Sequence, residues 1–266
     1  MPEGHVIHRA ARLHERRFGG ERVRAWSPQG RFSEGAARLD GQVLEGAEAR
    51  GKHLFYRWSS GEILHVHLGL FGKFRVHVSD PPPPTDGTRF AWEADTGTLY
   101  LAGATIVELV DPTAKEAIEA RLGPDPLVDE PGAAEGFIER LRRRSVPIGA
   151  ALLDQKAIAG VGNVYRAEIL FLAGVDPSTP AKEIEDPAAR AIWELSVEHL
   201  RRGERAGRIV TVDPDEVGAR SRKDLTRAER LYVYKRDGEP CRRCGSEVRI
   251  GESAGRSIWW CPACQG

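Results

Sequence analysis

The chain has no cysteine before position 241, which excludes a disulfide framework spread through the fold. It has no apolar run near the roughly 18 residues that a membrane-spanning helix needs, so we expect no membrane contact. Charges at Glu3 and Arg9 interrupt the start of the chain, so no secretory signal core is present and we expect a cytoplasmic protein. What is there is an ordinary globular composition over 266 residues, with 41% hydrophobic and 29% charged residues.

The formal net charge is zero, but the charges are unevenly distributed along the chain. Residues 1–80 and 201–266 carry a surplus of Lys and Arg, whereas residues 81–134 are acidic. Two basic ends favour a polyanionic partner such as a nucleic acid. A neutral protein with scattered charges is the alternative, and composition alone leaves it open.

The first residues after the start, Pro2 and Glu3, carry a distinct chemistry. Met1 is expected to be removed because Pro follows it, which would leave the secondary amine of Pro2 at the start of the chain. Such an amine attacks carbonyl-like carbons as a catalytic Lys does, and a pKa near about 8 leaves part of it unprotonated at neutral pH. Glu3 is a candidate proton donor beside it. Alone, the pattern also fits an ordinary N-terminus ahead of a helix.

The hydrophobic pattern predicts an α+β protein. Helical spacing over residues 3–17 is followed by eight short β-rich runs between residues 22 and 110, typical of an antiparallel sandwich or barrel. The proline-rich segment 80–87 is predicted to join two strands at the surface. From residue 112 the pattern is helical, and the helices are predicted at 113–123, 133–144, 146–155, 162–173 and 186–205.

We expect three parts along the chain. Residues 1–120 form an N-terminal β-sandwich, residues 121–230 a helical domain, and residues 231–266 a ribbon around the cysteines. The polar segment 206–230 is interpreted as a loop between the last two parts.

The four cysteines form two CxxC pairs, a pattern typical of a tetrahedral zinc site. Because all four donors are sulfur, the site would be closed and structural, and we expect one Zn²⁺. A redox pair, two disulfides, or another thiophilic metal are the alternatives. The residues concerned are Cys241, Cys244, Cys261 and Cys264.

The run AIAGVGN predicts a glycine turn that leads into a helix at Asn163. Gly160 and Gly162 can adopt positive φ, and the following helix start offers unpaired N–H groups to a phosphate. An ordinary glycine turn between two helices is the alternative reading.

Taken together, five segments resemble the formamidopyrimidine-DNA glycosylase / endonuclease VIII family, and its actinobacterial endonuclease VIII-like members most of all. They occur in the family's order from one end of the chain to the other: MPEGH, RGKHLF (50–55), GVGN (160–163), VYKRDGEPC (233–241) and GRSIWWC (255–261). The resemblance implies an N-terminal helix and two-layer β-sandwich, then a helical domain with a helix–two-turns–helix and a zinc ribbon.

The resemblance also implies roles for individual residues. Pro2 matches the nucleophile that attacks C1′ of the damaged nucleoside, and Glu3 the acid. Lys52 matches the lysine near the lesion phosphate. Asn163 matches the residue of the helix–two-turns–helix that binds backbone phosphate, and Arg256 the zinc-hairpin arginine that grips phosphate and assists δ-elimination.

Three further residues are weaker candidates. Leu70 and Phe71 are predicted to be wedges that fill the gap left by a flipped nucleotide, with a role as core residues at a strand end equally open. Tyr234 is a candidate contact to the DNA backbone. Val6 departs from the family, which usually has a second Glu at this place, and this departure bears on the rate of catalysis.

His65 and His67 alternate on one strand face. Because we expect no carboxylate or third histidine nearby, we interpret them as packed or surface residues rather than metal ligands.

The sequence therefore predicts a bifunctional DNA glycosylase / AP lyase of base excision repair. It would act on damaged DNA as a monomer in the bacterial cytoplasm, at the nucleoid, and remove oxidised bases by Pro2 Schiff-base chemistry with β,δ-elimination, with pyrimidines as the favoured class. The alternatives are a glycosylase for 8-oxoguanine and formamidopyrimidines, a weakly catalytic protein that binds lesions or abasic sites, and a zinc-ribbon protein that binds RNA or protein.

Overall fold

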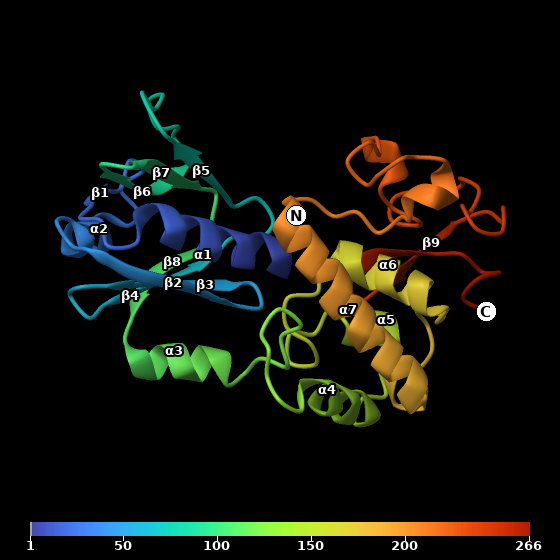
Figure 1. The fold of residues 1–266 in the computed structure, drawn as a ribbon. Coiled ribbons are helices and arrows are strands. Elements are labelled where there is room, and N and C mark those ends of the chain that lie inside the picture. Colours follow the sequence, from blue (N-terminus) through green and yellow to red (C-terminus); the bar gives the residue numbers. More distant parts are fainter. Residues whose placement is uncertain (1) are drawn as a thin grey trace. The chain divides into compact units, whose positions relative to one another are not determined.

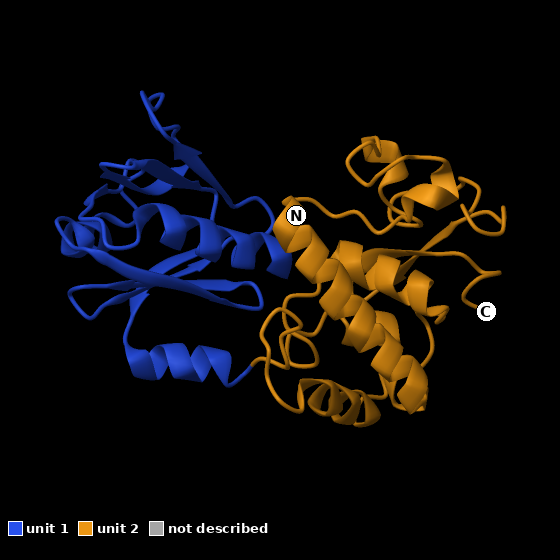
Figure 2. Ribbon diagram, viewed as in Figure 1, with its two compact units in different colours: residues 1–121 blue, residues 122–266 orange. Residues whose placement is uncertain are grey.

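The computed structural model describes residues 2–266, so the expected removal of Met1 lies outside the described residues. The chain divides into two compact units, residues 1–121 and 122–266 (Figure 2). Among the described residues, no helix is long and apolar enough to cross a membrane.

The first unit is a sandwich of two antiparallel four-stranded sheets, in the orders β2-β3-β4-β8 and β1-β6-β7-β5 (Figure 1). All eight strands coincide with the predicted β-rich runs. The strands are β1 Arg24–Trp26, β2 Leu44–Arg50, β3 His53–Trp58, β4 Ile63–His67, β5 Lys73–His77, β6 Thr88–Ala94, β7 Gly97–Ala102 and β8 Ile106–Val110. The three helices of this unit are α1 Gly4–Phe18, α2 Ser33–Leu39 and α3 Pro112–Glu119.

Helix α1 packs against β2 and β3 and closes the core of this unit. Its buried residues recur every three or four positions, among them Ile7, Ala10 and Phe18, as the sequence pattern predicts. His14 follows the same spacing, and its Nδ1 shares a 2.6 Å hydrogen bond with the buried Tyr56 hydroxyl. The buried polar pair is satisfied, as a low-polarity core requires.

The proline-rich segment joins β5 to β6, both of which pair with β7. The prediction of a connection within one domain is thereby confirmed. Helix α2 was not predicted. It is short, contains a glycine, and buries only Ala36 and Leu39, so its pattern is too weak to distinguish from a loop.

The second unit begins with helices around one apolar core. Its helices are α4 Ala133–Arg142, α5 Ile148–Ala151, α6 Asn163–Ala173 and α7 Asp186–Ala206, with 3₁₀ turns η1 Ala181–Glu183, η2 Pro214–Val217 and η3 Arg227–Glu229. The predicted helix 146–155 is wrong in length. Pro147 delays its start, and after Leu152 the backbone turns toward the Gly160 segment.

A two-stranded ribbon ends the chain, with β9 Arg249–Ser253 paired to β10 Arg256–Trp260. The turn between the strands uses Ala254 and Gly255, both in the left-handed region at φ 54° and 68°. Positive φ at both positions matches the tight hairpin turns whose twist suits the flanking strands.

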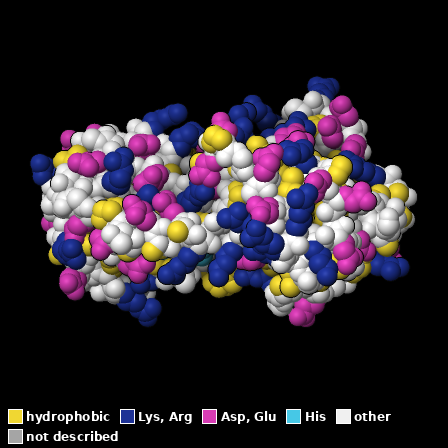
Figure 3. Space-filling model, turned by 90° about the horizontal axis from the view of Figure 1, so that it is seen from below, with side chains coloured by type: hydrophobic (Ala, Val, Ile, Leu, Met, Phe, Trp, Pro, Cys, Tyr) yellow, Lys and Arg dark blue, Asp and Glu magenta, His cyan; other side chains and the backbone are white. Residues whose placement is uncertain are grey.

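Lys and Arg side chains alternate with Asp and Glu over the face shown in Figure 3. Charged side chains of both signs are thus present on this face, in a chain with 39 Lys and Arg and 39 Asp and Glu.

Candidate active site and nucleic-acid interface

Pro2 and Glu3 lie at the start of α1. Glu3 is fully buried, and its carbonyl oxygen accepts a 2.9 Å hydrogen bond from the Val6 N–H. Pro2 is half-buried and lines a hollow of about 500 Å³ together with Val6, Leu70 and Phe71. Arg9 and Lys73 also line this hollow, so the structure presents Pro2 to a space with apolar and basic walls. The Glu3 side chain is kept away from solvent.

Leu70 and Phe71 form the tip of the turn between β4 and β5, where the chain crosses from one sheet to the other. Phe71 is 83% exposed and Leu70 47% exposed. Their interpretation as core residues is therefore wrong. Apolar side chains of this size are normally covered, so two exposed ones side by side indicate a surface that contacts another molecule.

The glycines on both sides of this tip are sterically required. A Cβ on Gly69 would lie 1.9 Å from Thr105 Oγ1, and one on Gly72 would lie 2.3 Å from the Leu68 carbonyl oxygen. At Gly69 and Gly72 the backbone thus lies so close to its neighbours that there is no room for a Cβ atom.

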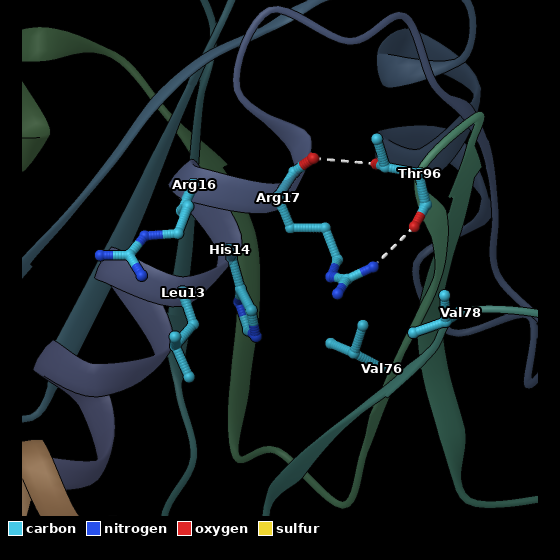
Figure 4. A pocket seen from close by; sticks show the side chains of 7 residues that line it. All are labelled: Leu13, His14, Arg16, Arg17, Val76, Val78 and Thr96. Atoms are coloured by element: carbon cyan, nitrogen blue, oxygen red, sulfur yellow. Dashed lines mark hydrogen bonds between the residues drawn. The ribbon is translucent and has the colours of Figure 1, made fainter.

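A second hollow, of about 560 Å³, continues along the same helix and shares Leu13 and His14 with the first (Figure 4). Val76 of β5 and Val78, just after the end of that strand, face it. Arg17 closes one end, where its guanidinium donates a 2.8 Å hydrogen bond to the Thr96 carbonyl.

Lys52 occupies the tight turn between β2 and β3. Arg50 pairs with His53, so the turn contains only Gly51 and Lys52, and Gly51 has a φ of 58°. A glycine in this conformation at the first turn position suits a two-residue hairpin. The Lys52 side chain is thus carried on a short, well-defined corner of the sheet.

The histidines near this corner correct one expectation. Both a third histidine and a carboxylate lie next to His65: its Nε2 shares a 2.8 Å hydrogen bond with His53 Nδ1, and its Nδ1 lies 2.9 Å from Glu108 Oε1. Sequence reasoning missed this cluster because it depends on how β3, β4 and β8 align. Among the described residues, only the cysteines form a group compact enough to hold a metal ion. That His65 and His67 bind no metal stays a prediction.

In the second unit, Asn163 is the first residue of α6 and is 5% exposed. Its side-chain amide donates a 3.1 Å hydrogen bond to the Ser257 carbonyl, while its Oδ1 has no partner among the described residues. Gly160 has a φ of 86°, as predicted, but Gly162 is in extended backbone that any residue adopts.

Arg256 begins β10 and is exposed, and the backbone around it is held by Arg166 of α6. The Arg166 guanidinium is fully buried and donates to the carbonyl oxygens of Gly149, Ser253, Arg256 and Ser257. The sequence analysis missed Arg166. The available signal was its spacing of three from Asn163, which puts both side chains on one face of the helix.

Tyr234 packs within the ribbon. Its ring lies edge-on to Trp259 at 4.7 Å between centroids, and its backbone N–H donates a 2.8 Å hydrogen bond to Glu168. The same buried carboxylate also accepts from the N–H groups of Tyr232 and Val233 and from the Thr211 hydroxyl. Glu168 thus ties α6 to the segment that leads into the cysteines.

The four cysteine sulfurs all lie within 4.8 Å of one another. The sulfurs of Cys241 and Cys264 are 3.9 Å apart, and those of Cys244 and Cys261 are 3.4 Å apart, so neither pair is a disulfide. Tetrahedral zinc with Zn–S bonds of about 2.3 Å implies sulfur separations of about 3.8 Å. The donor set therefore fits a single thiolate-bound metal ion.

Comparison with known proteins places this geometry in a family. The profile of the formamidopyrimidine-DNA glycosylase N-terminal domain matches residues 1–112, and that of the formamidopyrimidine-DNA glycosylase H2TH domain matches residues 122–213. The chain is 45% identical over 272 residues to a Mycobacterium tuberculosis protein named endonuclease 8 1, and all of each chain is covered.

The chain belongs to the formamidopyrimidine-DNA glycosylase family.

Other relatives agree with this assignment. The chain is 34% identical over 269 residues to the DNA-(apurinic or apyrimidinic site) lyase Nei2 of Mycolicibacterium smegmatis, covering 100% of this chain and 99% of the relative. The complex between the Lactococcus lactis Fpg and an abasic site containing DNA matches with a TM-score of 0.83, at 26% identity and with 99% of each chain covered.

The fold class and the enzyme class expected from the sequence are thereby confirmed: the protein is a DNA glycosylase and AP lyase of base excision repair. Within this formamidopyrimidine-DNA glycosylase fold, the first unit carries Pro2, Glu3 and Lys52, and the second carries Asn163 and Arg256. The individual roles of these five residues remain predictions.

Proposed function

We propose that Pro2 is the nucleophile of this enzyme. Its secondary amine attacks C1′ of a damaged nucleoside, the bond from C1′ to the base breaks, and the base leaves with the proton that the amine loses. The C1′–O4′ bond then breaks, O4′ takes up a proton, and an iminium forms between Pro2 and the ring-opened sugar. Glu3 supplies the proton that this step needs. The observation that carries the proposal is the position of Pro2 in the wall of a hollow that Arg9 and Lys73 also line, with the buried Glu3 next to it in the chain.

Strand cleavage follows from the iminium by elimination. Loss of a C2′ proton breaks the bond from C3′ to its phosphate oxygen, and a second elimination breaks the bond at C5′. Lys52 and Arg256 are cations suited to the leaving phosphates, Arg256 through its fork of donors. Asn163 supplies a further phosphate contact at the start of α6, where the helix dipole also favours an anion.

Leu70 and Phe71 fill the gap that opens when a nucleotide leaves the base stack. Their exposure at the tip of a fixed turn supports this role. Tyr234 contributes through the ribbon, where its ring packs on Trp259, and we assign it a backbone contact to DNA.

The four cysteines hold one structural Zn²⁺, which would organise the ribbon because so short a hairpin has little core of its own. Zinc would supply no step of the reaction. We divide the chain into working parts at residues 1–120, 121–230 and 231–266, and we infer a monomer acting in the bacterial cytoplasm at the nucleoid.

Oxidised pyrimidines are the favoured substrate class. The identity of 45% to relatives named endonuclease 8 1, against 33% to a Thermus thermophilus protein named formamidopyrimidine-DNA glycosylase, supports this preference. Duplexes that carry one oxidised pyrimidine or one 8-oxoguanine, in matched sequence, separate the two classes by their single-turnover excision rates.

Borohydride trapping on abasic-site DNA tests the nucleophile. The wild type is expected to give a covalent adduct that peptide mapping places on residues 2–9, and Pro2→Ala to lose the adduct, while Pro28→Ala in the same unit retains it. An adduct on any other peptide, or retained Met1 in an active preparation, contradicts the proposal.

A second candidate function is binding without efficient chemistry. Val6 lines the hollow beside Pro2, at the place where the family resemblance puts a second Glu. If the wild type binds abasic DNA tightly but forms no adduct, this second function is the correct one.

A further inference from the structure

Three polar side chains form a continuous row on one face of the β2-β3-β4-β8 sheet. Strand register places His65 opposite Glu108, and His53 opposite His67. The alternating residues of the same strands, such as Leu54 and Val66, point into the core. The row therefore lies on the face turned away from the core of the sandwich. We call Glu108, His65 and His53 the histidine file.

The hydrogen bonds of the histidine file fix its direction. An ionised carboxylate only accepts hydrogen bonds, so Glu108 Oε1 accepts from His65 Nδ1–H across 2.9 Å. His65 is then left with a lone pair on Nε2, which accepts from His53 Nδ1–H across 2.8 Å. It follows that a neutral His53 carries its remaining lone pair on Nε2.

The surroundings keep these rings neutral and in place. His65 is only 2% exposed, and Phe55 stacks on both rings at interplanar angles of 18° and 14°. Burial first, and then His65, His67 and Lys52, lower the pKa of His53 to about 3. Burial also lowers the pKa of His65, against the opposing effect of Glu108. A protonated His53 would carry a charge that this site disfavours.

Lys52 directly precedes His53 in the two-residue turn, at the end of the file, and His67 is the register partner of His53. The ring centroids of His53 and His67 are 5.0 Å apart. The Lys52 ammonium contributes to the lowered pKa values of both histidines, after burial in each case. His67 has the opposite arrangement from His53, because its Nδ1 accepts a 3.2 Å hydrogen bond from the Gly69 N–H and its Nε2 therefore carries the proton. The corner that carries Lys52 thus has an acceptor on His53 and a donor on His67.

We propose that the histidine file positions Lys52: Glu108 and His65 lock His53 in the orientation and tautomer that present its Nε2 lone pair to the lysine ammonium. His53 is then a positioning residue, and Glu108 and His65 act through it. This inference rests on the proposed role of Lys52 in the elimination steps. Replacing a group that orients a metal ligand typically lowers activity about 10- to 100-fold, and we expect an effect of the same size for a group that orients Lys52.

The tautomers provide the first test, and they do not depend on activity. In ¹⁵N-histidine spectra of the full chain, with signals assigned by single-histidine variants, His53 and His65 are expected as Nδ1–H tautomers and His67 as Nε2–H. Glu108→Ala is expected to release His65 from its tautomer. An Nε2–H tautomer at His53 or His65 overturns the file, as does a second equivalent of zinc bound by these rings.

Kinetics provide the second test. Glu108→Ala and His53→Ala are expected to lower the single-turnover rate of abasic-strand cleavage by 10-fold or more, with the Kd for DNA changed less than twofold. Glu45→Ala, which removes another exposed carboxylate from the same sheet, is the matched control and is expected to keep the wild-type rate.

A double-variant cycle separates positioning from general destabilisation. In a Lys52→Met background, Glu108→Ala is expected to have no further effect on the cleavage rate. An additive loss in that background, or a wild-type rate for Glu108→Ala and His53→Ala, overturns the proposal. If the wild type itself neither traps nor cleaves abasic DNA, the proposed function fails instead, whatever the tautomers show.

Discussion

Replacing Glu168 by Gln tests how the second unit is held together. The two carboxylate oxygens accept hydrogen bonds from three consecutive backbone N–H groups and the Thr211 hydroxyl, and the side chain is fully buried. Gln has nearly the same shape but only one acceptor oxygen. Its NH₂ group would take the place of the second carboxylate oxygen and would face two hydrogen-bond donors there. At least two hydrogen bonds to a charged acceptor are therefore lost.

The expected cost follows from those bonds. Each hydrogen bond to a charged group contributes about 1.5–3 kcal/mol, so the loss of two lowers the free energy of unfolding by roughly 3–6 kcal/mol. At roughly 2–4 °C per kcal/mol for a chain of this size, Tm would fall by about 6–24 °C.

Urea and thermal unfolding of the zinc-loaded protein, followed by circular dichroism, measure both quantities. Glu194→Gln on α7 is the matched control, because Glu194 is exposed and its replacement is expected to change stability by less than about 0.5 kcal/mol. A Glu168→Gln protein whose stability lies within about 1 kcal/mol of that control would refute the reasoning.

Three other predictions concern the metal, the histidines and the exposed turn. Metal analysis is expected to find one zinc per chain. The Cys261→Ser variant is expected to lose both the zinc and the near-ultraviolet circular dichroism signal of the ribbon. Full zinc occupancy in Cys261→Ser would contradict the four-thiolate site. Burial lowers the pKa of His14 to about 3, so the unfolded chain binds a proton below pH 6.5 that the folded chain does not, and stability present above pH 6.5 is lost as pH falls toward 3. At pH 5 the loss of unfolding free energy due to His14 is about 2 kcal/mol. The unfolding free energy, measured with urea, should therefore depend less steeply on pH in His14→Gln. The same steepness in both proteins would count against this prediction. Phe71→Ala is expected to leave Tm unchanged, because the side chain is exposed. It should weaken binding of lesion DNA by about 5- to 100-fold, as expected for a lost stacking contact. An equal loss of affinity for undamaged DNA would exclude a role of Phe71 as a wedge in the base stack.

Period-two and helical patterns predicted most of the fold because they report burial directly. In β3, Leu54, Tyr56 and Trp58 point inward and are buried, as the period-two pattern predicts. Phe55 is buried as well, on the opposite face, where Lys115 covers its ring. The helix predicted over 146–155 is too long because Leu152, beyond the end of the helix, is as buried as Ile148 and Ala151 within it. Only Ile148–Ala151 forms a helix there, and the sequence carries no signal that separates a buried turn from a buried helix.

The candidate site was predictable where a residue's role follows from local chemistry or from a motif. The cysteine pairs and the glycine turn before Asn163 are such cases. The histidine file was not, since His53, His65 and Glu108 meet only through the register of three strands. Arg166 and Glu168 were missed for a related reason: buried charges inside an apolar helix become intelligible only when their partners, far away in sequence, are known.

The glycine-flanked turn between β4 and β5 has a consequence for how this protein tolerates change. A side chain at position 69 or 72 meets Thr105 or the Leu68 backbone, so a saturation library should reject nearly every replacement there on stability alone. Positions 70 and 71 lie at the exposed tip, where the fold makes few demands. Selection for a folded protein would therefore leave the tip open to variation, and any restriction found at these two positions would measure what the bound nucleic acid requires.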